Sequence, residues 1–308
     1  MIYDVIVAGG GPAGMTAVIY AQRAMLKTLV IEKNYMSGGQ IINTYEVDNY
    51  PGLPGINGFD LAMQVDAHAR KLGAEIVNAD IQTIRVNDRT GLKEVVTDEG
   101  VFEAKTVIVC LGAAHRHVGV PGEQEFAGKG VSYCATCDGA FYRDKTVAVV
   151  GGGDVAIEDA IFLARQSKKV YVVHRRDSLR ATKVLQEALF ALPNVEMVWD
   201  SGLSEIKGDS KVSGVVIQNL KDDSLREVEL DGVFIAIGLD PVTAAVKELL
   251  ALNEQGYIVA GEDTRTNVPG IFAAGDIRTT PLRQIITAMA DGAVAVSMAQ
   301  SYLTEKVG

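Results

Sequence analysis

Residues 5–33 read "VIVAGGGPAGMTAVIYAQRAMLKTLVIEK", and this stretch decides the fold. A β-branched apolar run leads into three glycines, a segment of helical period follows, and a second apolar run ends the stretch. This order is typical of a βαβ unit. Residues 147–175 repeat it as "VAVVGGGDVAIEDAIFLARQSKKVYVVHR". Two such units predict an α/β protein with two Rossmann-like, three-layer nucleotide-binding domains.

The first glycine cluster has the spacing of a dinucleotide-binding loop. Gly9, Gly11 and Gly14 form G-x-G-x-x-G between a strand and a helix. The first glycine permits the tight turn, the second lets the backbone approach a pyrophosphate, and the third lets helix and strand pack closely. Glu32 lies 23 residues after Gly9, where an acid accepts a hydrogen bond from a ribose hydroxyl. The alternative is a glycine-rich turn that binds nothing, and the matching strand, helix and acid favour the cofactor site.

The second cluster is a G-x-G-x-x-A variant made by Gly151, Gly153 and Ala156. His174 takes the place of the acid, 23 residues after Gly151. The basic residues that follow are Arg175, Arg176 and Arg180. Without a carboxylate at this position, arginines favour the 2′-phosphate of NADP over NAD. The alternative is a solvated basic turn.

The domain organisation follows from an echo between the two halves. The strands "TVIVCLG" (106–112) and "GVFIAIG" (232–238) each come after a polar region and before a proline-bearing link. The C-terminal part has no βαβ unit of its own, so we expect it to complete the first domain. The expected division is a first domain of residues 1–115 and 242–308, with residues 116–241 inserted as the second.

Composition narrows the class of protein. Apolar residues make up 48% of the chain, charged residues 22%, and the net charge is −10. A chain of this charge would be repelled by a nucleic-acid backbone. We expect no membrane span, because no run approaches 18 apolar residues. The N-terminus "MIYDVIVAGG" has no leader pattern, so a cytoplasmic protein is expected.

The segment "SYCATCDGAFY" (132–142) holds Cys134 and Cys137 in a C-x-x-C spacing, and Cys110 is the third cysteine. A zinc site would need four ligands, with Cys110, His115 and His117 as the candidates, and no second metal-type pair is present. A structural disulfide would close a loop too small to stabilise much, in a compartment that opposes it. A redox dithiol fits best. Asp138 is placed to move the proton that a leaving thiolate requires, although Asp-Gly is also a common turn pair.

Taken together, these motifs resemble bacterial-type, NADPH-dependent thioredoxin reductases along essentially the whole chain. The resemblance is carried by "GGGPAG", "GGQ" (38–40), "YCATCDG" (133–139), "GGGDVA", "HRRDSLR" (174–180), "GIFAAGD" (270–276) and "RQ" (283–284). It implies a homodimeric flavoprotein with FAD in the first domain, and NADPH and the cysteine pair in the second. It also implies thioredoxin as the disulfide substrate, Cys137 as the sulfur that faces the flavin, Cys134 as the sulfur that attacks the substrate, and Asp138 as the acid.

The resemblance also places residues at each cofactor, and no metal is expected. The expected FAD residues are Gly9, Gly11, Pro12, Ala13, Gly14, Glu32, Lys33, Gly39, Gln40, Asn49, Gly275, Asp276, Arg283 and Gln284. The expected NADPH residues are Gly151, Gly153, Asp154, Ala156, His174, Arg175, Arg176 and Arg180.

The chain departs from the family pattern at two places. Cys110-Leu111-Gly112 stands where the family has Ala-Thr-Gly, and "GLDPVT" lacks an Asn after its proline. Both lie near the domain crossings. Among other functions, an oxidase that closes a disulfide in a small molecule could share this architecture. A ferredoxin-linked reductase disagrees with the intact "HRRDSLR", and a redox-sensing binding protein would need an output module.

Overall fold

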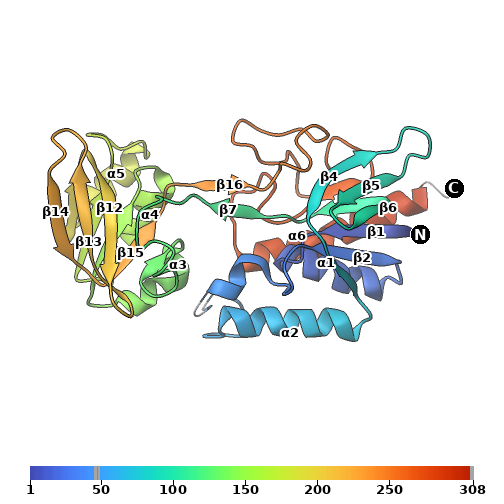
Figure 1. The fold of residues 1–308 in the computed structure, drawn as a ribbon, viewed down its shortest axis with the longest axis horizontal. Coiled ribbons are helices and arrows are strands. Elements are labelled where there is room, and N and C mark those ends of the chain that lie inside the picture. The colour runs from blue at the N-terminus through green and yellow to red at the C-terminus, as the bar shows by residue number, and fades with distance from the viewer. Residues whose placement is uncertain (45–46, 48, 306–308) are drawn as a thin grey trace. The chain divides into compact units, whose positions relative to one another are not determined.

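The computed structural model describes residues 1–44, 47 and 49–305. Its contacts divide the chain into two compact units (Figure 1). The first unit comprises Met1–Asn43, Tyr50–Ala114 and Asp240–Gly308, and the second comprises Thr44–Asn49 and His115–Leu239. The second unit is therefore an insertion in the sequence of the first.

The first unit is built on a mixed sheet. A parallel part has the order β3-β2-β1-β6, and β17 pairs in parallel with the carboxyl-terminal end of β6. An antiparallel part continues from β6 to β5 and β4. The strands are β1 (Ile2–Ala8), β2 (Thr28–Glu32), β3 (Glu75–Asn78), β4 (Ile81–Val86), β5 (Lys93–Thr97), β6 (Gly100–Val109) and β17 (Ile271–Ala273).

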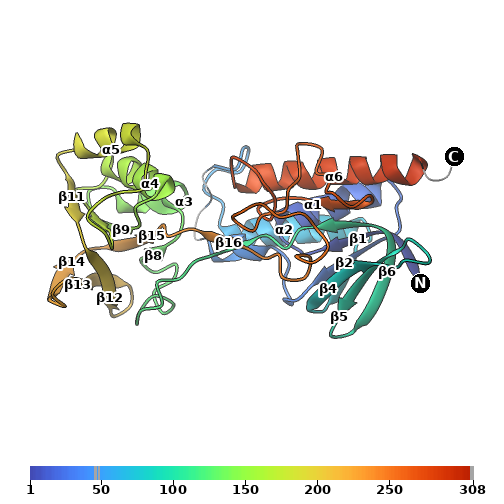
Figure 2. The same ribbon diagram turned by 90° about the horizontal axis from the view of Figure 1, so that it is seen from above.

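Both faces of this sheet are buried, which is why residues 5–8 of β1 form a continuous apolar run. Val5 and Val7 pack into one hydrophobic cluster with α1 (Pro12–Arg23) and α6 (Ile285–Glu305), while Ile6 and Ala8 pack into another on the opposite face. Figure 2 shows α1 and α6 together on one side of the strands. Two further helical segments complete the unit, the short η1 (Gly39–Asn43) and α2 (Gly58–Lys71).

The second unit has a five-stranded sheet, β11-β10-β9-β15-β8, in which every described pair is parallel. Helices lie on one side of it and an antiparallel sheet, β12-β13-β14, on the other (Figure 2). The strands are β8 (Val131–Ser132), β9 (Thr146–Val150), β10 (Lys169–Val173), β11 (Val195–Val198), β12 (Ser201–Gly208), β13 (Val212–Asn219), β14 (Leu225–Glu229) and β15 (Gly232–Ile235). The helices are α3 (Ala135–Asp138), η2 (Gly139–Tyr142), α4 (Asp154–Ala164) and α5 (Lys183–Phe190).

The core of the second unit repeats the alternation seen in the first. Val147 and Val149 of β9 face the helices, and Ala148 and Val150 face the antiparallel sheet. In the first unit, Ile84 of β4 and Val95 of β5 pack in the same cluster as Ile6, on the face opposite the helices. Each unit thus has parallel strands with helices on one face and antiparallel strands on the other, and the predicted three-layer α/β class is confirmed.

Two short strands form the connections between the units. β7 (Ala113–His115) and β16 (Leu239–Pro241) pair as a two-stranded sheet.

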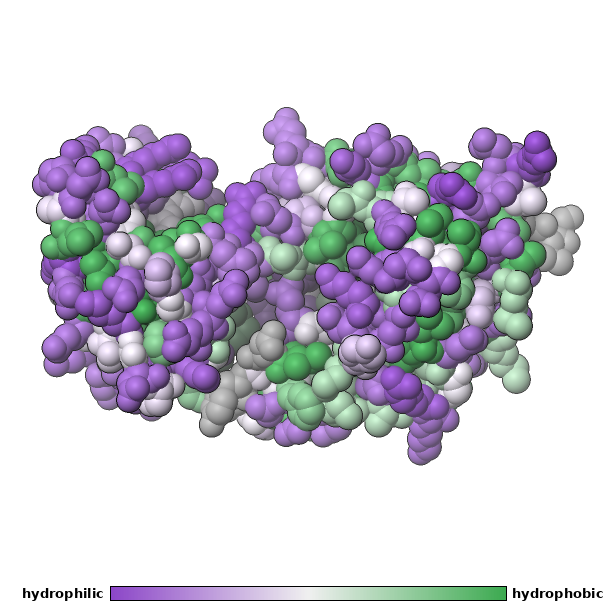
Figure 3. All heavy atoms as spheres, viewed as in Figure 1, coloured by the Kyte–Doolittle hydropathy of each residue, from purple (hydrophilic) through white to green (hydrophobic). Residues whose placement is uncertain are grey.

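Hydrophilic residues cover much of the visible face of the molecule, with hydrophobic residues in scattered patches (Figure 3). Across residues 1–44, 47 and 49–305, no helix is both long and apolar enough to cross a membrane.

Candidate active site

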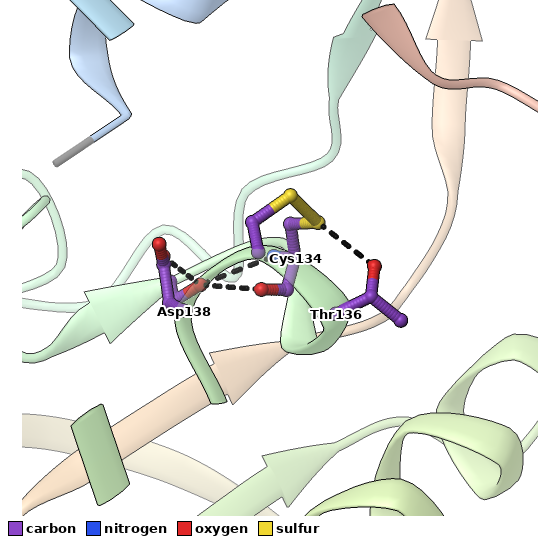
Figure 4. Close-up of a disulfide and its surroundings, with 5 residues drawn as sticks. Cys134, Thr136 and Asp138 are labelled. Carbon is purple, nitrogen blue, oxygen red and sulfur yellow. Dashed lines mark hydrogen bonds between the residues drawn. A yellow bond between two sulfur atoms is a disulfide. The ribbon is translucent and has the colours of Figure 1, made fainter. Parts of the chain in front are cut away.

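Cys134 and Cys137 form a disulfide at the start of the four-residue helix α3, with their Cα atoms 5.3 Å apart. Both cysteines are partly exposed. The Thr136 hydroxyl donates a hydrogen bond of 3.4 Å to Cys134 Sγ (Figure 4). A partly exposed disulfide can be reached by a reductant or by a second disulfide, whereas a fully buried one cannot.

Asp138 ends the same helix and has an environment suited to a proton donor. Ser132 Oγ donates to Asp138 Oδ2 at 2.6 Å and accepts from the Cys134 N–H at 3.1 Å. The other carboxyl oxygen is buried and has no hydrogen-bond partner among the described residues. Burial raises the pKa of Asp138, and the Ser132 hydrogen bond opposes that rise. A carboxyl that is easier to protonate than usual therefore lies on the helix that carries the disulfide.

A second hydrogen-bond network lies beside the cysteines. Glu123 is 1% exposed, and its carboxylate accepts from the N–H groups of Val118 and Gly119 and from the Tyr133 hydroxyl, at 2.6–3.1 Å. His117 Nδ1 lies 3.1 Å from the same carboxylate. Burial raises the pKa of Glu123, but these hydrogen bonds outweigh it and the pKa is lowered overall. Since Tyr133 directly precedes Cys134, this network fixes the chain entering the disulfide.

The first glycine loop is packed tightly against its own helix. Gly9 has a φ of +106°, and a Cβ on Gly14 would lie 1.9 Å from the Gly9 carbonyl oxygen. Only glycine at position 14 permits this approach. Gly11 is the residue before α1, Pro12 begins the helix without needing an N–H partner, and Ala13 follows it.

The "GGQ" turn comes directly against this loop. The Gly38 N–H donates to Gly10 O at 2.8 Å, and a Cβ on Gly39 would lie 3.2 Å from Gly11 Cα. The Gln40 side chain donates from Nε2 to Ala113 O, at the start of β7 and four residues after the end of β6. Two segments from different parts of the sequence thus meet at the carboxyl ends of β1 and β6, where open α/β sheets bind ligands.

Glu32, at the end of β2, is held in place by hydrogen bonds. Its Oε2 accepts from the Gly10 N–H at 2.7 Å, and Oε1 accepts from the backbone and side chain of Asn34 at 2.9 and 2.8 Å. A carboxylate has about four lone-pair sites, so a position remains for a ligand hydroxyl. Lys33 follows it and is exposed.

The C-terminal motif residues join the same unit. Gly275 lies against Ala13, since a Cβ on Gly275 would be 3.0 Å from Ala13 Cβ. Burial raises the pKa of Asp276 to about 6, against the pull of Arg283. The Arg283 guanidinium stacks 4.0 Å from the Tyr257 ring centroid, and its buried Nε has no partner among the described residues. Gln284 directly precedes α6.

The second glycine loop is arranged around His174 instead of an acid. The imidazole lies over Gly152, where a Cβ would be 2.3 Å from the ring, and its Nε2 contacts Ser178 O at 3.1 Å. Burial and, less strongly, the neighbouring arginines lower the pKa of His174, although its contact with Ser178 O opposes this. Asp154 accepts from the Thr182 N–H at 2.7 Å, and the Arg180 N–H donates to Gly152 O at 2.8 Å.

Three arginines of this segment are available to a negatively charged ligand. Arg175, Arg176 and Arg180 are exposed, and no described residue pairs with their guanidinium groups. Gly153 precedes α4, and Ala156 packs within it, close to Gly151. The loop therefore presents glycine backbone at the helix start and three cations beside it.

The remaining candidates fall outside these groups. Asn49 lies in the segment Thr44–Asn49, next to residue 48, which is outside the described residues. Cys110 is buried at the end of β6, and burial raises the pKa of its thiol. His115 and His117 pack on the Tyr133 ring, and within the described ranges no group of three or more His, Cys, Asp or Glu is arranged to hold a metal ion.

Sequence reasoning missed several residues that organise the site. Ser132, Glu123 and Tyr133 hold the disulfide segment, while Arg278 and Asp291 hold the turn that follows β17. A charged residue inside an apolar helix, as Asp291 is in α6, was a usable signal.

Comparison with known proteins agrees with this geometry. The family model for pyridine nucleotide-disulphide oxidoreductases matches residues 3–292. A thioredoxin reductase from Listeria monocytogenes is 47% identical over 99% of this chain and 95% of its own length, and one from Bacillus subtilis is 45% identical over 99% and 96%. The crystal structure of thioredoxin reductase from Streptococcus pyogenes superposes with a TM-score of 0.92 at 46% identity, covering 99% of both chains. The resemblance predicted from the motifs is confirmed: this chain belongs to the pyridine nucleotide-disulphide oxidoreductase family, among its thioredoxin reductases.

Proposed function

We propose that this protein reduces thioredoxin, passing electrons from NADPH through FAD and the Cys134–Cys137 disulfide to the disulfide of thioredoxin. The observation that carries this function is a partly exposed disulfide beside Asp138, in a chain with two dinucleotide-type loops. When bound, FAD converts the hydride of NADPH into a pair of electrons that a disulfide can accept.

The first unit has features that suit FAD. The close-packed backbone of Gly9, Gly11 and Gly39 leaves no side chain where a pyrophosphate would approach. Glu32 is held at the strand end that meets a ribose, and Arg283 has a buried, unsatisfied Nε. Unsatisfied buried donors call for a partner, and a bound cofactor supplies one. The same unit contributes Pro12, Ala13, Gly14, Lys33, Gln40, Gly275, Asp276 and Gln284, and we also assign Asn49 to the flavin.

The second unit has features that suit NADPH. Gly151, Gly153, Asp154 and Ala156 form and support its loop. His174 remains mostly uncharged near neutral pH because its pKa is lowered, so the three exposed arginines carry the positive charge. Arginine pairs strongly with phosphate oxygens, which favours a 2′-phosphate at this position.

The thiol chemistry is assigned to three residues. Cys134 attacks the disulfide of thioredoxin as a thiolate, and a mixed disulfide forms as the first substrate sulfur leaves. Cys137 then attacks Cys134, re-forming the internal disulfide and releasing the second substrate sulfur. Asp138, with its raised pKa and its Ser132 anchor, supplies the proton that a leaving thiolate needs.

We further propose a cytoplasmic homodimer that uses neither nucleic acid nor a membrane as a partner. A reducing compartment suits a dithiol that must be regenerated in each cycle. The net charge of −10 disfavours nucleic acid, and dimerisation is what the resemblance to thioredoxin reductases implies.

The test is steady-state reduction of thioredoxin by the FAD-loaded protein with NADPH. Cys134→Ser and Cys137→Ser should each abolish turnover, because neither leaves a dithiol. Cys110→Ser is the matched control and should retain turnover, since this thiol is buried in the first unit. If the wild-type protein oxidised small dithiols but did not reduce thioredoxin, the proposed substrate would be wrong.

A further inference from the structure

A buried ion pair lies in the first unit, outside the motifs that define the cofactor loops. Arg278 is 8% exposed and Asp291 is 9% exposed. The guanidinium group donates to the carboxylate through two parallel hydrogen bonds, Nε to Oδ2 and Nη2 to Oδ1, both 2.6 Å long. This bidentate geometry fixes both the distance and the orientation of the two groups.

The same carboxylate holds both ends of the turn that contains Asp276. Asp291 Oδ2 accepts from the Gly275 N–H at 2.9 Å, and the Arg278 N–H closes the turn onto Gly275 O at 3.2 Å. Arg278 Nη1 also donates to Thr279 O at 2.8 Å. Asp276 lies between the two anchored residues, so its backbone direction is set by Asp291 and Arg278.

Asp291 belongs to α6, and the next residue, Gly292, lets this helix pack against the helix that follows the first glycine loop. A Cβ on Gly292 would lie 2.1 Å from Ala13 O, so α6 and the start of α1 are in direct backbone contact. Gly275 packs on Ala13 as well. The start of α1 at Pro12 and the turn at Asp276 are therefore both held by the same part of α6.

We propose that Arg278 and Asp291 are positioning residues of the flavin site. They hold the Gly275–Arg278 turn so that Asp276 and the start of α1 face the same ligand. This inference rests on the proposed binding of FAD in the first unit. A buried ion pair adds little to folding compared with an apolar pair of similar size. The effect of this ion pair is to fix the direction of the Gly275–Arg278 turn.

The test compares the FAD dissociation constant of the wild-type holoenzyme with those of three variants and one control variant. Asp291→Asn should raise the FAD dissociation constant by about 10- to 100-fold, because the turn loses hydrogen bonds to a charged group. The double variant Arg278→Met with Asp291→Leu fills the site with apolar side chains, so the urea unfolding midpoint should stay near that of the wild type. Its FAD dissociation constant should still rise by about 10-fold or more, and the visible circular dichroism of the bound flavin should change.

Two further arms keep the test decisive. Arg278→Lys retains the charge but loses the fork, and should raise the dissociation constant by about fivefold even if the double variant does not fold. Arg70→Met, which removes a half-exposed arginine from its ion pair with Asp66 on α2, is the control and should not change the FAD dissociation constant.

The two levels of the proposal fail differently. If the wild-type protein bound no FAD, the proposed function itself would be wrong. If it bound FAD, and the double variant or Arg278→Lys bound the cofactor with the wild-type dissociation constant, only the positioning role would be overturned.

Discussion

The two glycine loops share a backbone plan and differ in the side chain placed over it. In the first unit Glu32 lies over Gly10 and accepts its N–H at 2.7 Å. In the second unit His174 lies over Gly152, where a Cβ would be 2.3 Å from the ring. In the second loop the His174 ring occupies the space of a side chain at Gly152, whereas a Cβ on Gly10 would make a close contact of 3.1 Å with Glu32.

If the first loop binds FAD and the second NADPH, as proposed above, this difference is what lets one fold separate two cofactors. A fixed carboxylate accepts hydrogen bonds from ribose hydroxyls and repels a phosphate. A mostly neutral imidazole does not repel a phosphate, and the exposed arginines beside it attract one. The loops also differ in tightness: a Cβ is excluded at Gly14 in the first, while the second accommodates Ala156 at the same step.

The largest effect is expected from changing the residue at the third position of each glycine motif, which is Gly14 in the first unit and Ala156 in the second. Gly14→Ala should lower the free energy of unfolding by about 3 kcal/mol, because the new Cβ would clash with Gly9 O. FAD content should fall with it. Ala156→Gly, the reverse change in the second unit, should cost only about 1 kcal/mol. Urea unfolding of both variants measures the contrast, and equal losses would show that the two loops are equally tight.

The disulfide and its proposed acid, Asp138, have no counterpart among the described residues of the first unit, and Asp138→Asn tests that asymmetry. Turnover should fall by roughly 100-fold, since the asparagine cannot give a proton. The pKa of Asp138 is raised by burial, so the protonated acid persists to higher pH than an ordinary aspartate. The ratio of wild-type to variant kcat should therefore decrease as pH rises. Asp209→Asn, an exposed change in the same unit, should leave kcat unchanged.

The arginines give the next effect. The double variant Arg175→Ala, Arg176→Ala should lower kcat/KM for NADPH by roughly 30-fold while changing kcat/KM for NADH little, because only NADPH carries the 2′-phosphate. Arg143→Ala, another exposed arginine of the second unit, is the control. A parallel fall with both coenzymes would mean that these arginines do not read the phosphate.

The smallest effect concerns a carboxyl on α4. Burial, with a lesser contribution from Glu158, raises the pKa of Asp159 to about 7. The native state then holds this proton where the unfolded chain has lost it, so stability decreases as pH rises from about 4 to about 7. Asp159→Asn should stabilise the protein at pH 8, and the gain should vanish near pH 4. A gain that did not depend on pH would contradict the raised pKa.

Local patterns were enough to predict the parts of the site that are contiguous in sequence. The βαβ units, the glycine loops and the cysteine pair each fit within about thirty residues, and period and spacing reveal them. The supports could not be predicted in this way. Ser132 acts on Asp138 through a turn, and Arg278 meets Asp291 only because β17 and α6 pack together. Such pairs depend on tertiary contacts, which hydrophobic periodicity does not encode.

The most direct measurement counts thiols after NADPH is added anaerobically to the FAD-loaded protein. Alkylation and mass spectrometry should find one newly accessible pair, Cys134 and Cys137, with Cys110 unmodified because it is buried. Reduction by NADH should be much slower. If the flavin were reduced and the Cys134–Cys137 disulfide stayed intact, electrons would not pass through the second unit's disulfide, and the account would be wrong.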